Sequence, residues 1–195
     1  IAMPSYGGLA PEVAIERFKK ISGNGAKCTI VCVYGNRAYE DTLVQMEDVA
    51  KECGFDVIAA VAAVAEHSIM HQYAAGRPDA DDEKQLETFA EQISVKEGTV
   101  TSVPGNRPYK KGGGAGLVPK VTADCVKCGL CAESCPVKAI DQHSFKADSK
   151  SCISCMRCVS QCPHNARKVS GVMVGIVGLA LKKACSLRKE NELYL

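Results

Sequence analysis

Eight of the twelve cysteines fall into two runs with the same spacing, and this repeat constrains the fold more than any other feature. The first run is Cys125, Cys128, Cys131 and Cys135, followed by Pro136, and the second is Cys152, Cys155, Cys158 and Cys162, followed by Pro163. Each cysteine of the second run comes 27 residues after its counterpart. Such clustering is typical of metal binding rather than of a disulfide framework. It also indicates a reducing compartment, so we expect a cytoplasmic location.

The spacing C-x2-C-x2-C-x3-C-P resembles that of bacterial ferredoxins with two [4Fe–4S] clusters. Three thiolates spaced two residues apart lie on one tight loop, which can bind three corners of a cubane. The resemblance implies that the fourth cysteine of each run reaches the other cluster. The implied ligands are Cys125, Cys128, Cys131 and Cys162 for the first cluster, and Cys152, Cys155, Cys158 and Cys135 for the second.

Structural zinc is the alternative, because two sets of four cysteines satisfy two zinc sites by count. A zinc site has no need of a third cysteine at the same gap, nor of the Cys-Pro pair that ends each run. The spacing therefore favours two [4Fe–4S] clusters.

The charge of the cysteine-rich segment agrees with that interpretation. Between Lys120 and Lys168 there are eight Lys or Arg residues and four Asp or Glu residues, a formal charge of +4. An oxidised cluster with four thiolates carries about −2, so two clusters bring the segment to about zero. The basic residues expected to offset cluster charge are Lys127, Lys138, Arg157 and Arg167.

The charge and hydropathy of the whole chain exclude other classes. A net charge of +2 without a basic stripe argues against a nucleic-acid-binding protein. The longest uncharged apolar run, 171–181, is shorter than the roughly 20 residues of a membrane span. No Ser/His/Asp set, Walker loop or GxGxxG motif occurs, so the sequence predicts no catalytic residues.

The first half alternates between helical and extended patterns. Apolar spacing predicts helices over 11–21, 39–53 and about 79–93, and buried strands over 26–33 and 56–64. Strands that alternate with helices predict an α/β fold with a doubly wound parallel sheet.

Two loops of this half occupy positions where open α/β sheets bind ligands, beyond the carboxyl ends of strands. They contain Pro4, Ser5, Tyr6, Gly7 and Gly8 in one loop, and Tyr34, Gly35, Asn36 and Tyr39 in the other. Glycines allow close approach to a flat ligand and tyrosines can stack on it. From the residues alone, two ordinary βα turns are an equal alternative.

Both loops resemble the isoalloxazine loops of flavodoxin-like proteins. The chain is similar along nearly all its length to a family of anaerobe proteins that fuse a flavodoxin-like domain to a bacterial two-cluster ferredoxin. Further matching segments are 34–40, 65–68, 103–109 and 188–195. The resemblance implies FMN as a cofactor held by the two loops.

One feature of flavodoxin-like domains is missing, the Ser/Thr/Gly-rich loop that binds the flavin phosphate. The chain begins where the third strand of such a sheet would end, so we expect an incomplete flavodoxin-like sheet. We expect an oligomer, a second chain or the remainder of a longer polypeptide to complete it, and FMN binding to require that completion.

The predicted organisation has four parts. Residues 1–97 form the carboxyl part of a flavodoxin-like domain, and 98–119 form a connector rich in Gly and Pro that includes Gly113 and Gly114. Residues 120–169 form a small α+β two-cluster ferredoxin-like domain, and 170–195 form a C-terminal helix.

The predicted function is electron transfer between the two clusters and, in the complete protein, FMN, with redox proteins as partners. Two alternatives remain open. The first is an FMN-dependent reductase supplied with electrons by the clusters, and the second is a non-catalytic ferredoxin module whose α/β remnant serves for docking.

Overall fold

The computed structural model describes residues 1–112 and 116–195, so Gly113 and Gly114 of the predicted connector lie outside the described residues. The chain divides into two units. The α/β unit comprises Ile1–His67, His71–Gly112 and Lys183–Leu195. The cysteine-rich unit comprises Ser68–Met70 and the described part of Gly113–Lys182.

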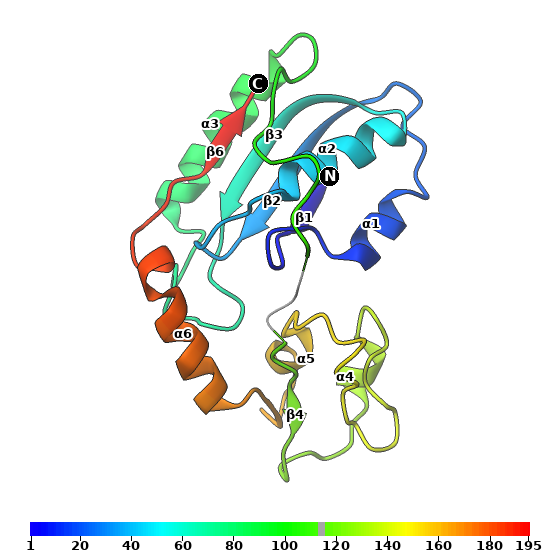
Figure 1. The fold of residues 1–195 in the computed structure, drawn as a ribbon, viewed down its shortest axis with the longest axis vertical. Coiled ribbons are helices and arrows are strands. Elements are labelled where there is room, and N and C mark those ends of the chain that lie inside the picture. Colours follow the sequence, from blue (N-terminus) through cyan, green and yellow to red (C-terminus); the bar gives the residue numbers. More distant parts are fainter. Residues whose placement is uncertain (113–115) are drawn as a thin grey trace. The chain divides into compact units, whose positions relative to one another are not determined.

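The α/β unit is built on a four-stranded sheet in the order β1-β2-β3-β6 (Figure 1). Strands β1 (Ala2–Pro4), β2 (Lys27–Tyr34) and β3 (Asp56–Val64) are parallel. Strand β6 (Glu192–Tyr194) pairs antiparallel with β3, with Val61 opposite Leu193. The parallel-rich sheet predicted from the alternating pattern is confirmed.

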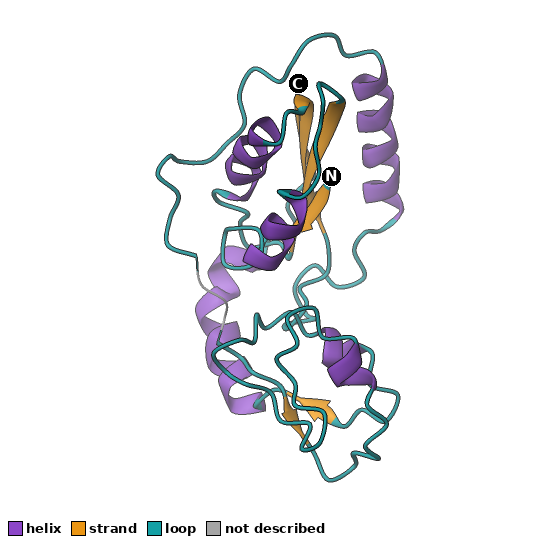
Figure 2. Ribbon diagram, turned by 90° about the vertical axis from the view of Figure 1, so that its right-hand side faces the viewer, coloured by secondary structure: helices purple, strands orange, loops and turns teal. Residues whose placement is uncertain are grey.

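Helices cover both faces of this sheet (Figure 2). Helices α1 (Glu12–Phe18) and α2 (Thr42–Glu52) lie on one side and α3 (Ala80–Ser94) on the other. Strand β3 is buried at all but two positions because its side chains point into both layers. The core contains Ile30, Leu43 and Val57, none of which has exposed surface.

Helix α3 begins with a reciprocal cap. The side chain of Asp79 accepts a bond from the Asp82 amide at 3.1 Å, and the Asp82 carboxylate accepts one from the Asp79 amide at 2.9 Å. Asp82 also forms a buried ion pair with Arg77, which lowers the pKa of the Asp82 carboxyl well below its ordinary value. Asn191 donates to the same carboxylate, so the start of α3 holds the C-terminal segment.

The C-terminal region differs from the expected single helix over 170–195. Helix α6 (Gly171–Cys185) ends ten residues before the C-terminus, and Glu192–Tyr194 form strand β6 instead. The C-terminal residues form a strand because the free edge of β3 presents backbone groups with which a short extended segment can pair. No helix of the described residues is long and apolar enough to cross a membrane.

The segment expected to be a connector packs partly on the α/β unit. Val100 and Val103 belong to its core. The buried Asp41 carboxylate accepts bonds from the amides of Asn106 and Lys110, both at 2.8 Å. These amides lower the pKa of Asp41, so the carboxylate stays charged where it fastens the segment.

The cysteine-rich unit reproduces the sequence repeat in its backbone. Helices α4 (Leu130–Glu133) and α5 (Arg157–Ser160) occupy equivalent positions, 27 residues apart. Strands β4 (Lys120–Val121) and β5 (Arg167–Lys168) pair antiparallel at the ends of the repeat.

The C-terminal segment is fastened by Asn36, whose side chain is 2% exposed. Its Nδ2 donates to the carbonyls of Cys185 and Leu187 at 2.8 Å, and its Oδ1 accepts from the Lys189 amide at 3.2 Å. We predict that Asn36→Ala speeds amide exchange in β6 at least tenfold, about 1.4 kcal/mol, because three bonds are lost and two carbonyls stay unpaired.

The matched control is Asn24→Ala. Asn24 has φ 48° and Asn36 has φ 61°, so both substitutions place alanine in the left-handed region. Asn24 is exposed and lies far from the C-terminal segment in sequence. Equal acceleration of β6 exchange in both variants would show that backbone strain, rather than the side-chain contacts, is responsible.

Candidate metal centre

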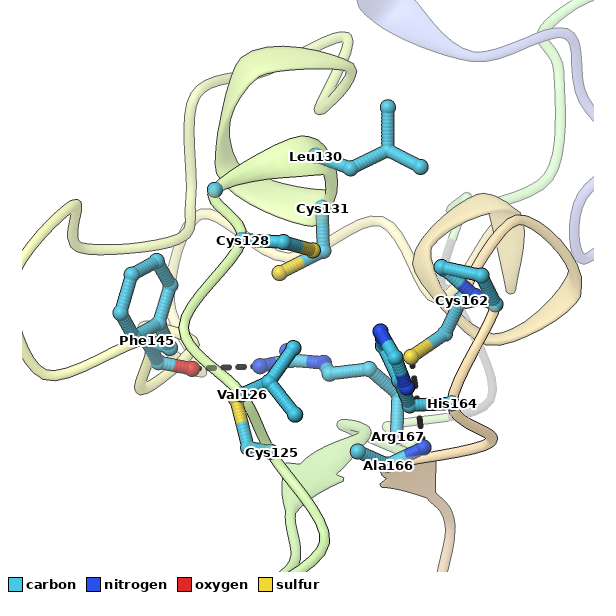
Figure 3. Close-up of a pocket in the computed structure, with 12 residues that line it drawn as sticks. Cys125, Val126, Cys128, Leu130, Cys131, Phe145, Cys162, His164, Ala166 and Arg167 are labelled. Atoms are coloured by element: carbon cyan, nitrogen blue, oxygen red, sulfur yellow. Dashed lines mark hydrogen bonds between the residues drawn. The ribbon is translucent and has the colours of Figure 1, made fainter.

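Four cysteines line a cavity formed by both halves of the repeat (Figure 3). They are Cys125, Cys128, Cys131 and Cys162, and their sulfur atoms surround a common space. The space between the lining residues, counted out to its open side, is about 340 Å³. Phe145, Ala166 and Arg167 form further parts of the wall.

The other four cysteines of the repeat line a second cavity of the same size. They are Cys135, Cys152, Cys155 and Cys158, and the corresponding space is about 350 Å³. Ile140, Ala147 and Met156 are among its apolar neighbours. Each cavity therefore receives three cysteines from one run and the Cys-Pro cysteine from the other, the grouping expected from the resemblance.

The two cavities are wrapped by loops of the same shape. Residues in the left-handed region occur as equivalent pairs: Lys127 and Ser154 (φ 60° and 53°), Gly129 and Met156 (85° and 59°), Lys138 and Asn165 (52° and 49°). This conformation costs a non-glycine residue about 1–2 kcal/mol. Five such residues at repeated positions indicate that the path around each cavity is enforced by something other than local preference.

Backbone amides point at the sulfur of each Cys-Pro cysteine. The amide of Ala139 donates to Cys135 Sγ and that of Ala166 donates to Cys162 Sγ, both at 3.3 Å. None of the twelve cysteines forms a disulfide bond.

Burial and charge act in opposite directions on two further thiols. Burial raises the pKa values of Cys131 and Cys158, and the nearby Arg167 guanidinium lowers both. Loading either site with metal thus requires loss of protons from these thiols.

The donor set fits a thiolate-bound iron–sulfur cluster. Within residues 1–112 and 116–195, no group of three or more His, Cys, Asp or Glu side chains is arranged to hold a single metal ion. The thiols instead stand around the walls of each cavity. Such an arrangement suits a cluster, because each of its iron atoms takes one thiolate.

Comparison with known proteins agrees with this chemistry. A family model described as a 4Fe-4S dicluster domain matches residues 124–166, a range that contains all eight cysteines. This segment is a ferredoxin-type iron–sulfur module. No curated protein and no solved structure matches the chain.

The four basic residues expected to offset cluster charge lie in different settings. Lys127, Lys138 and Arg157 are exposed, whereas Arg167 is 2% exposed and lines the first cavity. The sequence did not predict that burial. A signal was nevertheless present, because the repeat places the apolar Ile140 at the position equivalent to Arg167.

The residues expected to contact FMN have partners within the α/β unit. Asn36 fastens the C-terminal segment, as described above. Tyr39 donates to Glu192 Oε2 at 2.7 Å and shares a hydrogen bond with Tyr194 at 2.8 Å. Ser5 Oγ accepts from Thr42 Oγ1 at 2.8 Å.

The remaining members of the two loops are placed by the chain's own packing. Pro4 lies in β1 and Tyr6 bridges to Leu9. The buried Tyr34 ring lies edge-on to Tyr39 at 5.2 Å. Gly7 and Gly8 have positive φ, and a Cβ on Gly8 would overlap Glu40. A Cβ on Gly35 would lie 2.9 Å from His67 Cα. FMN contact by these loops stays a prediction.

Because the polar side chains of both loops are engaged, we predict that this chain contains iron and sulfide but no stoichiometric FMN. The measurement is quantification of iron, acid-labile sulfide and released flavin in one anaerobically prepared sample. One FMN per chain would contradict the prediction and would require Asn36 and Tyr39 to exchange their present partners.

Proposed function

We propose that this chain transfers single electrons through two [4Fe–4S] clusters, one in each four-cysteine cavity. The observation that carries the proposal is the sorting of eight cysteines into two cavities of equal size. Four thiolates per cavity is the number that a cubane cluster requires.

When bound, a [4Fe–4S] cluster supplies one-electron redox chemistry. The residues of this chain would bind it, exclude water and adjust the local charge. The amides of Ala139 and Ala166 stabilise negative charge on two of the sulfurs. The buried Phe145 forms part of the wall of the first cavity, and the buried Met156 forms part of the wall of the second.

Electron transfer to a partner protein requires that part of the module be accessible. Around the first cavity, Cys128 is exposed, and Val126 and Leu130 are 59% and 40% exposed. Exposed apolar side chains at the edge of a redox site suit a small, transient interface. We therefore propose that a redox protein exchanges electrons at the first cavity.

FMN is not part of the function proposed for this chain. The side chains of Asn36 and Tyr39 bind the C-terminal segment. The α/β unit also shows no set of residues to which we assign a reaction. The proposal is an electron carrier, with no substrate of its own.

Two double variants test the ligand sets. Cys128→Ala with Cys162→Ala removes two ligands of one proposed cluster, so the iron content should fall from about eight to about four. Cys128→Ala with Cys135→Ala removes one ligand from each proposed cluster, so both should be lost or weakened. Iron and sulfide analysis with electron paramagnetic resonance of the reduced protein checks both outcomes.

Cys53→Ala serves as the control, because Cys53 is a partly buried cysteine of the α/β unit and should leave the iron content unchanged. The opposite pattern, with about four irons kept when Cys128 and Cys135 are replaced, would assign each cluster to one run and overturn the exchange of ligands. Zinc in place of iron in the unmodified protein would overturn the function itself.

A further inference from the structure

Arg167 is the one basic side chain of residues 120–168 that is fully buried. It lies on β5, directly after Ala166, whose amide binds Cys162 Sγ. Figure 3 shows its side chain extending along the first cavity toward Phe145. A buried guanidinium is costly unless its charge is compensated.

Two backbone carbonyls hold the guanidinium. Nη1 donates to the Phe145 carbonyl, and Nη2 donates to the Pro119 carbonyl at 3.1 Å. Nε has no hydrogen-bond partner. Within the described part of the chain, no carboxylate forms an ion pair with Arg167. The charge is therefore fixed in position but not neutralised by protein.

The position of Arg167 relates it to both cavities. Its side chain lines the first cavity. Its Nη2 binds the carbonyl of Pro119, and Pro119 lines the second cavity. The side chain therefore extends from the wall of the first cavity to a residue of the second.

The repeat isolates this feature. The position equivalent to Arg167 in the first run is Ile140, which is buried and pairs with Ala147. The short helices and the left-handed loop residues recur at equivalent positions in both halves, so the arginine is a local departure from the repeat. An apolar side chain suffices at the equivalent position, and packing therefore does not demand a charge there.

We propose that Arg167 is an internal counter-charge that raises the reduction potentials of the iron–sulfur centres. The inference rests on the proposed function. Reduction adds one electron and one negative charge to the site, and a fixed positive charge favours that state. The missing counter-ion of the guanidinium is then the negatively charged cluster with its thiolates.

The experiment is a redox titration of the anaerobically prepared protein with dithionite, followed by electron paramagnetic resonance. Arg167→Met keeps most of the side-chain length without the charge. We expect the reduction equilibrium constant of at least one centre to fall at least tenfold, about 59 mV for one electron. Combining Arg167→Met with Cys135→Ala and Cys155→Ala, which removes two proposed ligands of the second centre, shows whether the centre in the first cavity is the one that shifts.

Arg157→Met is the matched control, because Arg157 is an exposed arginine of the same unit. Its substitution should shift neither potential by as much, since solvent screens its charge. Arg167→Lys retains a positive charge and should restore most of the potential. Unchanged potentials in Arg167→Met with its full iron content would overturn the proposal.

If Arg167→Met does not hold its iron, Arg167→Gln and Arg167→Lys decide the matter. Retention of iron by Arg167→Lys but not by Arg167→Gln would support a requirement for positive charge at this position. Loss of iron from both variants would overturn the proposal. Equal iron content with equal reduction potentials in both variants would also overturn it. Absence of iron from the unmodified protein would instead be a failure of the proposed function, so the two results are distinguishable.

Discussion

The proposed coordination of eight thiolates by two clusters is the interaction on which we expect the ferredoxin-type module to depend. Among the described residues, its apolar core cluster is small and is formed by the buried side chains of Ala132, Ile140 and Phe145. The strands β4 and β5 have two residues each, and helices α4 and α5 have four each. Elements this short do not persist without further support, whereas metal–thiolate bonds add their binding free energy to folding.

The left-handed loop residues follow from the same constraint. Lys127 and Ser154 accept an unfavourable backbone conformation at equivalent positions, and so do Lys138 and Asn165. A cluster held on three sides by one loop and on the fourth by the other run can offset that cost. In the proposed arrangement, the Cys-Pro cysteine of each run binds the cluster of the other run, so neither half would be complete without the other.

The α/β unit is stabilised differently, by packing and by long-range hydrogen bonds to its C-terminal segment. Asn36 and Asp82, from distant parts of the chain, both bind this segment. The C-terminal segment forms hydrogen bonds with Asn36 and Tyr39. These residues follow β2, at an edge of the sheet where open α/β proteins commonly bind a ligand. Residues whose types suggested a ligand-binding site thus form contacts within the chain instead.

Much of this could be predicted from sequence where a pattern was local or repeated. The spacing of Cys125 to Cys135 and its recurrence predicted an iron–sulfur module, and the resemblance to two-cluster ferredoxins implied which cysteines share a cavity. The apolar runs predicted β2 and β3. Strand β6 could not be predicted, because three residues give no periodicity and its partner lies more than 120 residues away. The role of Asn36 depends on contacts that only the folded chain creates. For the burial of Arg167 the sequence held one indirect signal, the apolar Ile140 at the equivalent position of the repeat.

The most direct test of two clusters with exchanged ligands is X-ray diffraction at the iron absorption edge, from crystals of anaerobically prepared protein. We predict two iron centres per chain. One should lie among the sulfurs of Cys125, Cys128, Cys131 and Cys162, and the other among those of Cys135, Cys152, Cys155 and Cys158. A single iron centre, zinc at these cysteines, or two centres each bound by the four cysteines of one run would contradict it.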